Sequence, residues 1–275
     1  MKIPSFIIFT GKFLQFISPK LASLYVAKLF STPFKHKIPK RELEMDANSR
    51  QTVLFIPQIN KEIVTYNYGH SEKKILLVHG WSGRGTQLFK IADELIKNGY
   101  STISFDAPAH GKSKGATTLL PEFVFCIIEL EKKFGPFDFA IGHSLGGMSI
   151  LKAISDGLVL KKAVIIGSGD LIQDIITDFL KKLQLSQKVG LLMKQYFEKK
   201  SGTSMESLSS YISAAQVSNA VLIIHDSDDD DVNVTCAYNI HKHLLGSELM
   251  ITEHLGHRKI LGDKKVIEKI INYLS

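Results

Sequence analysis

A serine flanked by glycines, in the stretch AIGHSLGG at residues 140–147, has the clearest chemical potential in this sequence. Gly142, Ser144 and Gly146 match the pattern G-x-S-x-G, with an apolar segment before it and a helix-forming segment after it. Glycines on both sides permit a turn too tight for larger side chains. Such a turn would expose the hydroxyl at a helix N-terminus, where partial positive charge favours a developing anion. The pattern therefore predicts a nucleophilic serine on a strand-turn-helix corner.

A serine hydroxyl is a weak nucleophile unless a base accepts its proton and a third group orients that base. Two downstream segments offer these groups. VLIIHDSDDDDV, at residues 221–232, places five aspartates directly after an apolar run, and ITEHLGHRKIL, at residues 251–261, places His257 after the last predicted strand. The competing histidines are His241 and His243, expected on a helix surface, and the nearby His254. The chain thus supplies a nucleophile, an acid and a base in that order.

These residues need a scaffold, and the hydrophobic pattern predicts one. Short apolar runs alternate with helical periodicity from residue 51 onward, which favours a mainly parallel sheet with helices on both faces. The first two strands are expected to form an antiparallel pair. The predicted strands lie at 53–56, 62–68, 73–80, 101–105, 137–141, 163–166, 221–224 and 248–251, and the predicted helices at 87–97, 122–134, from 148 onward, 235–245 and 264–274.

One interval is too long for a simple crossover between strands. Residues 168–218 contain two segments of helical periodicity, around 172–183 and 192–197. Ligands in open α/β folds bind at the carboxyl ends of the strands. We therefore predict a helical cap insertion over that edge of the sheet, within a domain at residues 51–275.

The N-terminal residues 1–50 carry most of the positive charge. Their nine Lys/Arg and three Asp/Glu contribute +6 of the total net charge of +7, so the rest of the chain lacks the basic face that a nucleic-acid partner would need. The apolar run at 6–9 is too short for a membrane span, and no signal-peptide cleavage pattern follows it. We expect a helical extension packed on the domain, with peripheral membrane contact as the alternative. Its predicted apolar face comprises Leu21, Leu24, Tyr25 and Leu29.

Five segments taken together resemble the α/β-hydrolase superfamily of serine hydrolases, the esterases and lipases. They are VHGWSGRG, FDAPAHGKS, GHSLGG, IIHDSDDDDV and LGHRKIL, in the family order, and the similarity runs from about Glu62 to the C-terminus. The resemblance implies that Ser144 is the nucleophile and His257 the base. The family pattern H-x-x-x-D-x-x-V selects Asp229 as the acid, with Asp226 as the alternative.

The resemblance also implies the oxyanion hole and the floor of the site. The residues after His-Gly and after the nucleophile are Trp81 and Leu145, whose backbone N–H groups are the expected donors. The turn HGKS at residues 110–113 is expected to shape the floor of the site. Ala109 stands where the family usually has glycine.

The expected activity is cleavage of a carboxylic ester or thioester of a small acyl substrate through an acyl-enzyme on Ser144, with no cofactor. Two alternatives stay open: a binding protein of the same fold without turnover, and a membrane-surface lipid hydrolase. No metal or nucleotide site is expected, since the zinc-ligand, EF-hand and Walker patterns are incomplete. Cys126 and Cys236 are expected to be reduced thiols in a cytoplasmic, or membrane-associated, protein.

Overall fold

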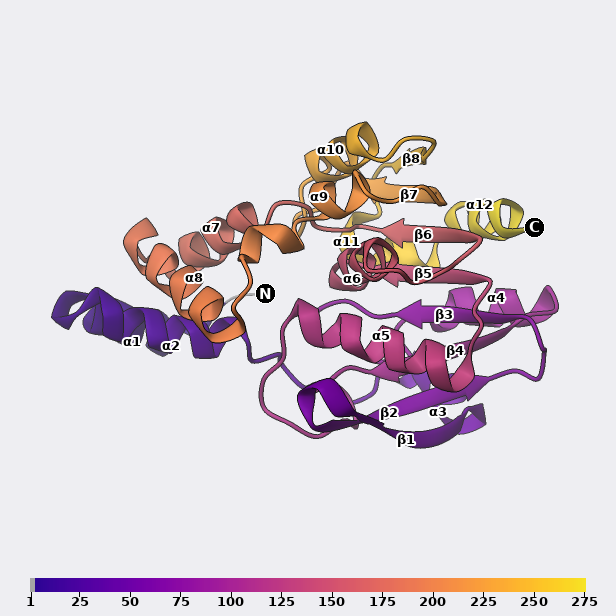
Figure 1. The fold of residues 1–275 in the computed structure, drawn as a ribbon, viewed down its shortest axis with the longest axis horizontal. Coiled ribbons are helices and arrows are strands. Elements are labelled where there is room, and N and C mark those ends of the chain that lie inside the picture. Colours follow the sequence, from indigo (N-terminus) through magenta and orange to yellow (C-terminus); the bar gives the residue numbers. More distant parts are fainter. Residues whose placement is uncertain (1–2) are drawn as a thin grey trace.

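Eight strands form one sheet in the order β1-β2-β4-β3-β5-β6-β7-β8 in the computed structural model, which describes residues 3–275 (Figure 1). β1 and β2 pair antiparallel, β2 pairs antiparallel with β4, and all pairs from β4 to β8 are parallel. The predicted fold class is therefore confirmed. The strands are β1 Arg50–Ile56, β2 Lys61–Tyr68, β3 Lys74–Val78, β4 Ser101–Asp106, β5 Phe139–His143, β6 Lys162–Ile166, β7 Ala220–Asp226 and β8 Glu248–Thr252.

The central strands bury both faces because their apolar side chains alternate between two helical layers. In β3, Leu76 and Val78 pack toward one layer, whereas Ile75 and Leu77 pack toward the other. The first layer contains α5 Leu120–Phe134, α6 Leu145–Ser155 and α10 Thr235–His243, and the second contains α4 Phe89–Lys97 and α12 Lys264–Leu274. Short helices complete the domain: α3 Leu43–Asn48, α9 Ser210–Ala214 and α11 Gly256–Lys259.

Two helical hairpins lie beyond the carboxyl ends of the strands, at the left of Figure 1. The cap hairpin consists of α7 Ile172–Leu183 and α8 Gln187–Ser201, and the N-terminal hairpin of α1 Ser5–Ile17 and α2 Pro19–Phe30. The two N-terminal helices pack against each other. The hydroxyl of Tyr25 in α2 donates to the carbonyl of Ile7 in α1, 3.4 Å away. α2 packs along α8, and the Phe30 ring lies 5.3 Å from that of Phe179. The two hairpins therefore form one helical layer.

The face on which α2 packs differs in part from the predicted one. Tyr25 and Leu29 are partly buried against the core, as predicted, whereas Leu21 and Leu24 are 47% and 44% exposed. The buried side chains are small: Ala22, Ser23, Val26 and Ala27. Small side chains let two helix backbones approach closely, and this close packing against α8 determined which face of α2 is buried.

Helix α6 begins three residues earlier than predicted, at Leu145. Glycine has a low intrinsic helix propensity, so Gly146 and Gly147 led to a predicted helix start at Met148. The contacts of the turn require these glycines. A Cβ on Gly146 would lie 2.3 Å from the carbonyl oxygen of Val78, so tertiary packing outweighs propensity here.

Candidate active site

Ser144 occupies the corner between β5 and α6 in a strained conformation. Its φ of 54° and ψ of −120° lie outside the helical and strand regions, and such a conformation in a non-glycine residue costs roughly 1–3 kcal/mol. The corner is held by a hydrogen bond of 2.8 Å from the Ser144 N–H to the carbonyl of Ile166 in β6. The strain thus presents the side chain at the N-terminus of α6, as the sequence pattern predicted.

His257 and Asp229 are brought together by loops that are 28 residues apart in sequence. His257 Nδ1 lies 2.7 Å from Asp229 Oδ2, and the side chains are 11% and 1% exposed. The N–H groups of Asp231 and Val232 donate to Asp229 Oδ1 at 2.9 and 2.8 Å. Burial alone would raise the pKa of Asp229, but the hydrogen bonds, including those from His225 and His257, hold it well below the usual carboxyl range. Asp229 therefore stays ionised at neutral pH, with its carboxylate facing the imidazole of His257.

The Ser144 hydroxyl and the His257 imidazole share neighbours at the ends of β5 and β6. The ring of His143, adjacent to Ser144, lies 4.5 Å from that of His257. Gly167 follows Ile166, the partner of the Ser144 N–H, and a Cβ on Gly167 would lie 3.2 Å from His257 Nδ1. Within residues 3–275 the Ser144 hydroxyl makes no hydrogen bond, and catalytic contacts of this kind often tighten only with substrate.

Two further histidines, which the sequence analysis did not assign, position this pair. His143 Nε2 donates to the backbone carbonyl of His257 at 2.8 Å, and His225 Nε2 donates to the carbonyl of Val232 at 3.0 Å. His225 Nε2 also lies 3.5 Å from Asp229 Oδ2. Both histidines stand inside the quoted motifs, in GHSLGG and IIHDSDDDDV, so their placement there was the available signal.

Asp226, the alternative acid, contacts the loop before His257 and not its imidazole. Its carboxylate accepts hydrogen bonds from the Thr252 hydroxyl at 2.7 Å and from the N–H groups of Leu255 and Gly256 at 3.2 and 2.8 Å. These bonds tie the end of β7 to the loop that carries His257. Asp226 makes no hydrogen bond to the imidazole among the described residues, so the structure places Asp229 and not Asp226 beside it.

The loop that carries Trp81 lies directly against the nucleophile. A Cβ on Gly80 would fall 2.9 Å from the Cβ of Ser144, so only glycine permits this approach. Gly83 N–H closes the turn on the carbonyl of Gly80 at 3.0 Å, and Ser82 has a left-handed φ of 57°. Neither the Trp81 nor the Leu145 N–H is paired in the described part of the chain. Two unpaired backbone N–H groups therefore flank Ser144: that of Trp81, in this turn, and that of Leu145, at the start of α6.

Two buried histidines hold this loop. His79 Nδ1 donates to the carbonyl of Gly80 at 2.7 Å while its Nε2 accepts from the N–H of Ala107 at 3.0 Å. His110 Nε2 accepts from the N–H of Ser82 at 3.0 Å. His110 Nδ1 in turn donates to the carbonyl of Pro108 at 3.1 Å. Each ring therefore donates from Nδ1 and accepts at Nε2, which requires the neutral form. The HGKS turn thus positions the loop that carries Trp81 through His110.

Asp106 accepts hydrogen bonds from both the Trp81 loop and the HGKS turn, a role that the sequence analysis did not identify. It accepts from the N–H groups of Gly85 and Lys112 at 2.7 and 2.6 Å and from the Tyr66 hydroxyl at 2.8 Å. Burial raises the pKa of Asp106 despite these hydrogen bonds. Ala109 has a φ of 65°, a left-handed conformation that explains why glycine suits this position in the family.

The buried histidines predict instability in acid. Burial lowers the pKa of His79 to about 4, of His143 to about 3 and of His110 to about 2. An unfolded histidine titrates near 6.5, so unfolding takes up protons below that pH and stability falls as the pH decreases from about 6.5 toward 4. Each histidine contributes up to about 1.4 kcal/mol per pH unit.

Urea unfolding at a series of pH values measures this slope. We expect these three histidines to contribute nearly three protons to the uptake on unfolding near pH 5, and His110→Gln to take up about one proton fewer than wild type. A pH-independent unfolding free energy between 6.5 and 4 would contradict the assignment of neutral buried rings.

The remaining chemistry-bearing side chains lie outside this cluster. His254 is 84% exposed and lies 2.7 Å from Asp228, as expected of a solvated acidic turn. Cys126 is buried and Cys236 half-buried, both as free thiols. Among residues 3–275, no group of three or more His, Cys, Asp or Glu side chains has the arrangement of a metal site.

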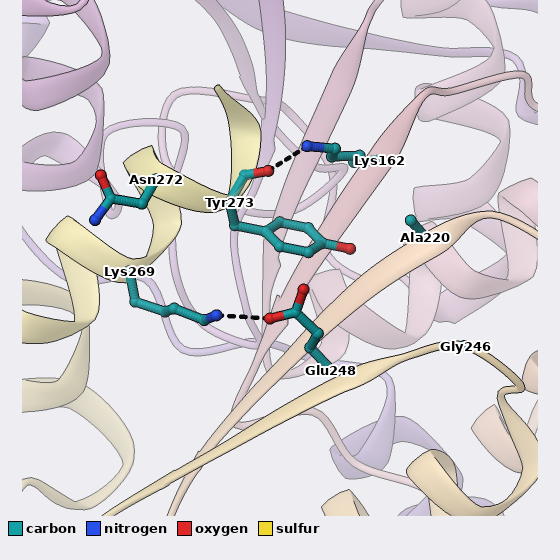
Figure 2. A pocket seen from close by; sticks show the side chains of 7 residues that line it. All are labelled: Lys162, Ala220, Gly246, Glu248, Lys269, Asn272 and Tyr273. Carbon is teal, nitrogen blue, oxygen red and sulfur yellow. Dashed lines mark hydrogen bonds and ion pairs between the residues drawn. The ribbon is translucent and has the colours of Figure 1, made fainter.

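Two cavities flank the sheet at opposite ends. A cleft of about 610 Å³ borders the Trp81 loop, and five exposed cations line it: Lys37, Arg41, Lys90, Arg258 and Lys259. A smaller cavity of about 350 Å³ lies at the amino ends of the strands, where Lys269 pairs with Glu248 and Lys162 donates to the carbonyl of Tyr273 (Figure 2). The smaller cavity contains none of the predicted catalytic groups, so of these two cavities the cationic cleft is the one that adjoins the site.

The parallel sheet, the strained serine corner and the Asp229–His257 contact together define an α/β-hydrolase site. Residues 75–237 match the model of the alpha/beta hydrolase family, more than half of the chain, and the protein belongs to that family. Membership supports a hydrolytic role. No curated protein matches the sequence significantly.

Solved structures with a similar fold include an esterase from Exiguobacterium antarcticum, at 18% identity and a TM-score of 0.63, covering 82% of this chain and 99% of that one. An esterase from Pyrococcus furiosus has 15% identity and a TM-score of 0.67, covering 89% and 97%. A membrane phospholipase A described as a bacterial virulence factor has 15% identity and a TM-score of 0.65, covering 85% and 88%. At these identities the similarity shows the fold.

Proposed function

We propose that this protein is a serine hydrolase that cleaves a carboxylic ester or thioester through an acyl-enzyme on Ser144. The observation that carries the proposal is the 2.7 Å contact between His257 and the buried Asp229 carboxylate, beside a serine on a strained corner. A buried carboxylate with a lowered pKa fixes the imidazole tautomer with Nδ1 protonated. That tautomer leaves Nε2 as the base.

In the proposed first step, Ser144 Oγ attacks the substrate carbonyl carbon while His257 Nε2 takes its proton. The resulting imidazolium is stabilised by Asp229 and returns the proton to the leaving alcohol or thiol as the carbonyl bond re-forms. Water then attacks the acyl-enzyme, with His257 again as the base, and releases the carboxylic acid and the free serine. The same three groups therefore serve both halves of the reaction.

The backbone N–H groups of Trp81 and Leu145 are the proposed oxyanion donors. Their support is the close approach of Gly80 to Ser144 and the position of Leu145 as the first residue of α6. Loss of one such donor typically costs about 3–4 kcal/mol of transition-state stabilisation. The hydrogen bonds of His79 and His110 keep the first donor in place before substrate binds.

A fluorophosphonate probe tests the nucleophile, and p-nitrophenyl esters of graded chain length test turnover. We expect the probe to label purified wild type at Ser144, identified by mass spectrometry of the peptide, and to leave Ser144→Ala unlabelled. Wild type should hydrolyse the esters, and Ser144→Ala should keep only a small residual rate. A folded wild-type protein that resists the probe and turns over no ester would contradict the proposal and favour the alternative of a binding protein with this fold.

A further inference from the structure

Helix α1 is apolar on two opposite sides, but only one side is covered. Ile7, Leu14 and the buried Gly11 face the other helices, and a Cβ on Gly11 would lie 3.2 Å from the Leu185 side chain. The opposite side carries a row of phenylalanines at intervals of three and four residues: Phe6, Phe9, Phe13 and Phe16, which are 68%, 72%, 54% and 91% exposed. We call this row the phenylalanine face. A helix that is apolar all round is normally buried in a core or a membrane.

The phenylalanine face is larger than ordinary surface apolarity explains. Because each phenylalanine has roughly 200 Å² of surface, the four together expose on the order of 600 Å². Ile17, Leu21 and Leu24, which are 56%, 47% and 44% exposed, add to the apolar surface of the same hairpin. Soluble monomers rarely expose more than a few hundred Å² of contiguous apolar surface unless it binds something.

The charges around this face identify the kind of partner. The first 41 residues contain eight Lys or Arg and no Asp or Glu. Lys12, Lys20 and Lys28 are exposed on the hairpin itself, and Lys20 and Lys28 stand one turn on either side of Leu24. The cap hairpin beside it, over residues 172–201, has six lysines and three acidic residues. Exposed phenylalanines on a hairpin that also carries exposed lysines are typical of helices that lie on anionic lipid.

We propose that the phenylalanine face binds the surface of an anionic membrane. The phenylalanine rings enter the boundary between head groups and acyl chains, and the lysines of both hairpins contact lipid phosphates. In the described part of the chain, no helix is long and apolar enough to cross a bilayer. α1, with 13 residues, is about 20 Å long and matches a helix lying in the interfacial plane.

Charge argues against the two other ways of covering this face. A second copy would place two basic hairpins against each other, and like charges in contact oppose association. A protein partner would have to combine an apolar groove with an acidic rim, whereas an anionic bilayer offers both properties over any area. The N-terminal hairpin also lies at the end of the molecule away from the sheet, with the cap hairpin beside it (Figure 1).

Membrane binding would also indicate the substrate class. The strands end toward the helical layer that contains both hairpins, so the hairpin that docks lies at the Ser144 end of the sheet (Figure 1). The substrate would then be an ester of a lipid, an extension that rests on the proposed function. The docking itself does not depend on catalysis.

Flotation with vesicles tests the docking, using phosphatidylcholine alone and an equal mixture of phosphatidylcholine and phosphatidylglycerol. We expect wild type to bind the anionic vesicles at least tenfold more tightly. Replacing Phe6, Phe9, Phe13 and Phe16 together with Gln should weaken that binding at least 100-fold, because burial of even one phenylalanine changes partitioning by about tenfold or more. A variant with Gln in place of Lys12, Lys20 and Lys28 should bind the anionic vesicles more weakly than wild type does. Its binding to phosphatidylcholine vesicles should be unchanged.

A matched control removes four exposed apolar residues elsewhere: Val53, Phe55, Val159 and Leu245, each changed to Gln. This variant should bind as wild type does, and circular dichroism with thermal melting should show that both quadruple variants are folded. Equal binding of wild type and the phenylalanine variant would overturn the proposal. The proposal would also be overturned if wild type did not bind vesicles. It would likewise be overturned if wild type self-associated and the phenylalanine variant did not.

Ser144→Ala separates this proposal from the proposed function. The variant should float with anionic vesicles as wild type does, since its phenylalanine face is intact. Vesicle binding with no ester turnover would contradict the hydrolase and leave the docking standing. Ester turnover with no vesicle binding would contradict the docking alone.

Discussion

Ser144→Ala and His257→Ala are each expected to lower kcat for a p-nitrophenyl ester by about 10⁶-fold. The effects should not add. The double variant should be as active as either single variant, because a nucleophile without its base and a base without its nucleophile are equally unable to form the acyl-enzyme. Activity above the uncatalysed rate should persist in all three variants, supplied by the oxyanion donors.

The control for this experiment is His254→Ala. His254 is 84% exposed and pairs with Asp228, away from the imidazole of His257, so its loss should change kcat by less than about twofold. Full activity in His257→Ala, or a large loss in His254→Ala, would show that the base has been assigned to the wrong histidine. Thermal melting of each variant separates a chemical loss from an unfolded protein.

Asp229→Asn is expected to lower kcat by about 10⁴-fold with little change in KM. The amide keeps the size of the carboxylate and can still accept from the N–H groups of Asp231 and Val232. It cannot stabilise the imidazolium that forms during attack, and its NH₂ group favours the wrong imidazole tautomer. The loss should therefore appear in the chemical step.

Asp226→Asn is the matched comparison, since it makes the same chemical change three residues away. Its carboxylate holds the loop of His257 through Thr252, Leu255 and Gly256. We expect a lower melting temperature and a kcat reduction of less than about 100-fold, through looser positioning of the base. A larger kcat loss in Asp226→Asn than in Asp229→Asn would reverse the assignment of the acid.

The sequence alone indicated Ser144 as the proposed nucleophile and His257 as the proposed base. The turn at Ser144 needs glycines within a few residues, and these are visible in the printed sequence. The regular alternation of strands and helices likewise follows from local hydrophobic periodicity, so the predicted parallel sheet was confirmed. Position after the last strand indicated His257.

The choice among five neighbouring aspartates could not be made in the same way. The spacing of the family pattern favoured Asp229 but left Asp226 open, because both follow the same strand. Both carboxylates are buried in the structure. Only the fold decides which carboxylate lies 2.7 Å from His257 Nδ1. The positioning roles of His143 and His225 depend on contacts with backbone carbonyls, which no side-chain pattern specifies.

The sequence by itself determined the class of fold, because the period of apolar side chains predicts strands and helices. It also determined the strained serine corner, because the glycines that permit the turn are local, and the order of the reactive residues along the chain. Tertiary structure decided which aspartate faces the imidazole, which side of α2 is buried and that the phenylalanines of α1 face outward. The physical reason is that burial is a property of pairs of elements. A helix that is apolar on every side carries no sequence signal for which side its neighbours will cover.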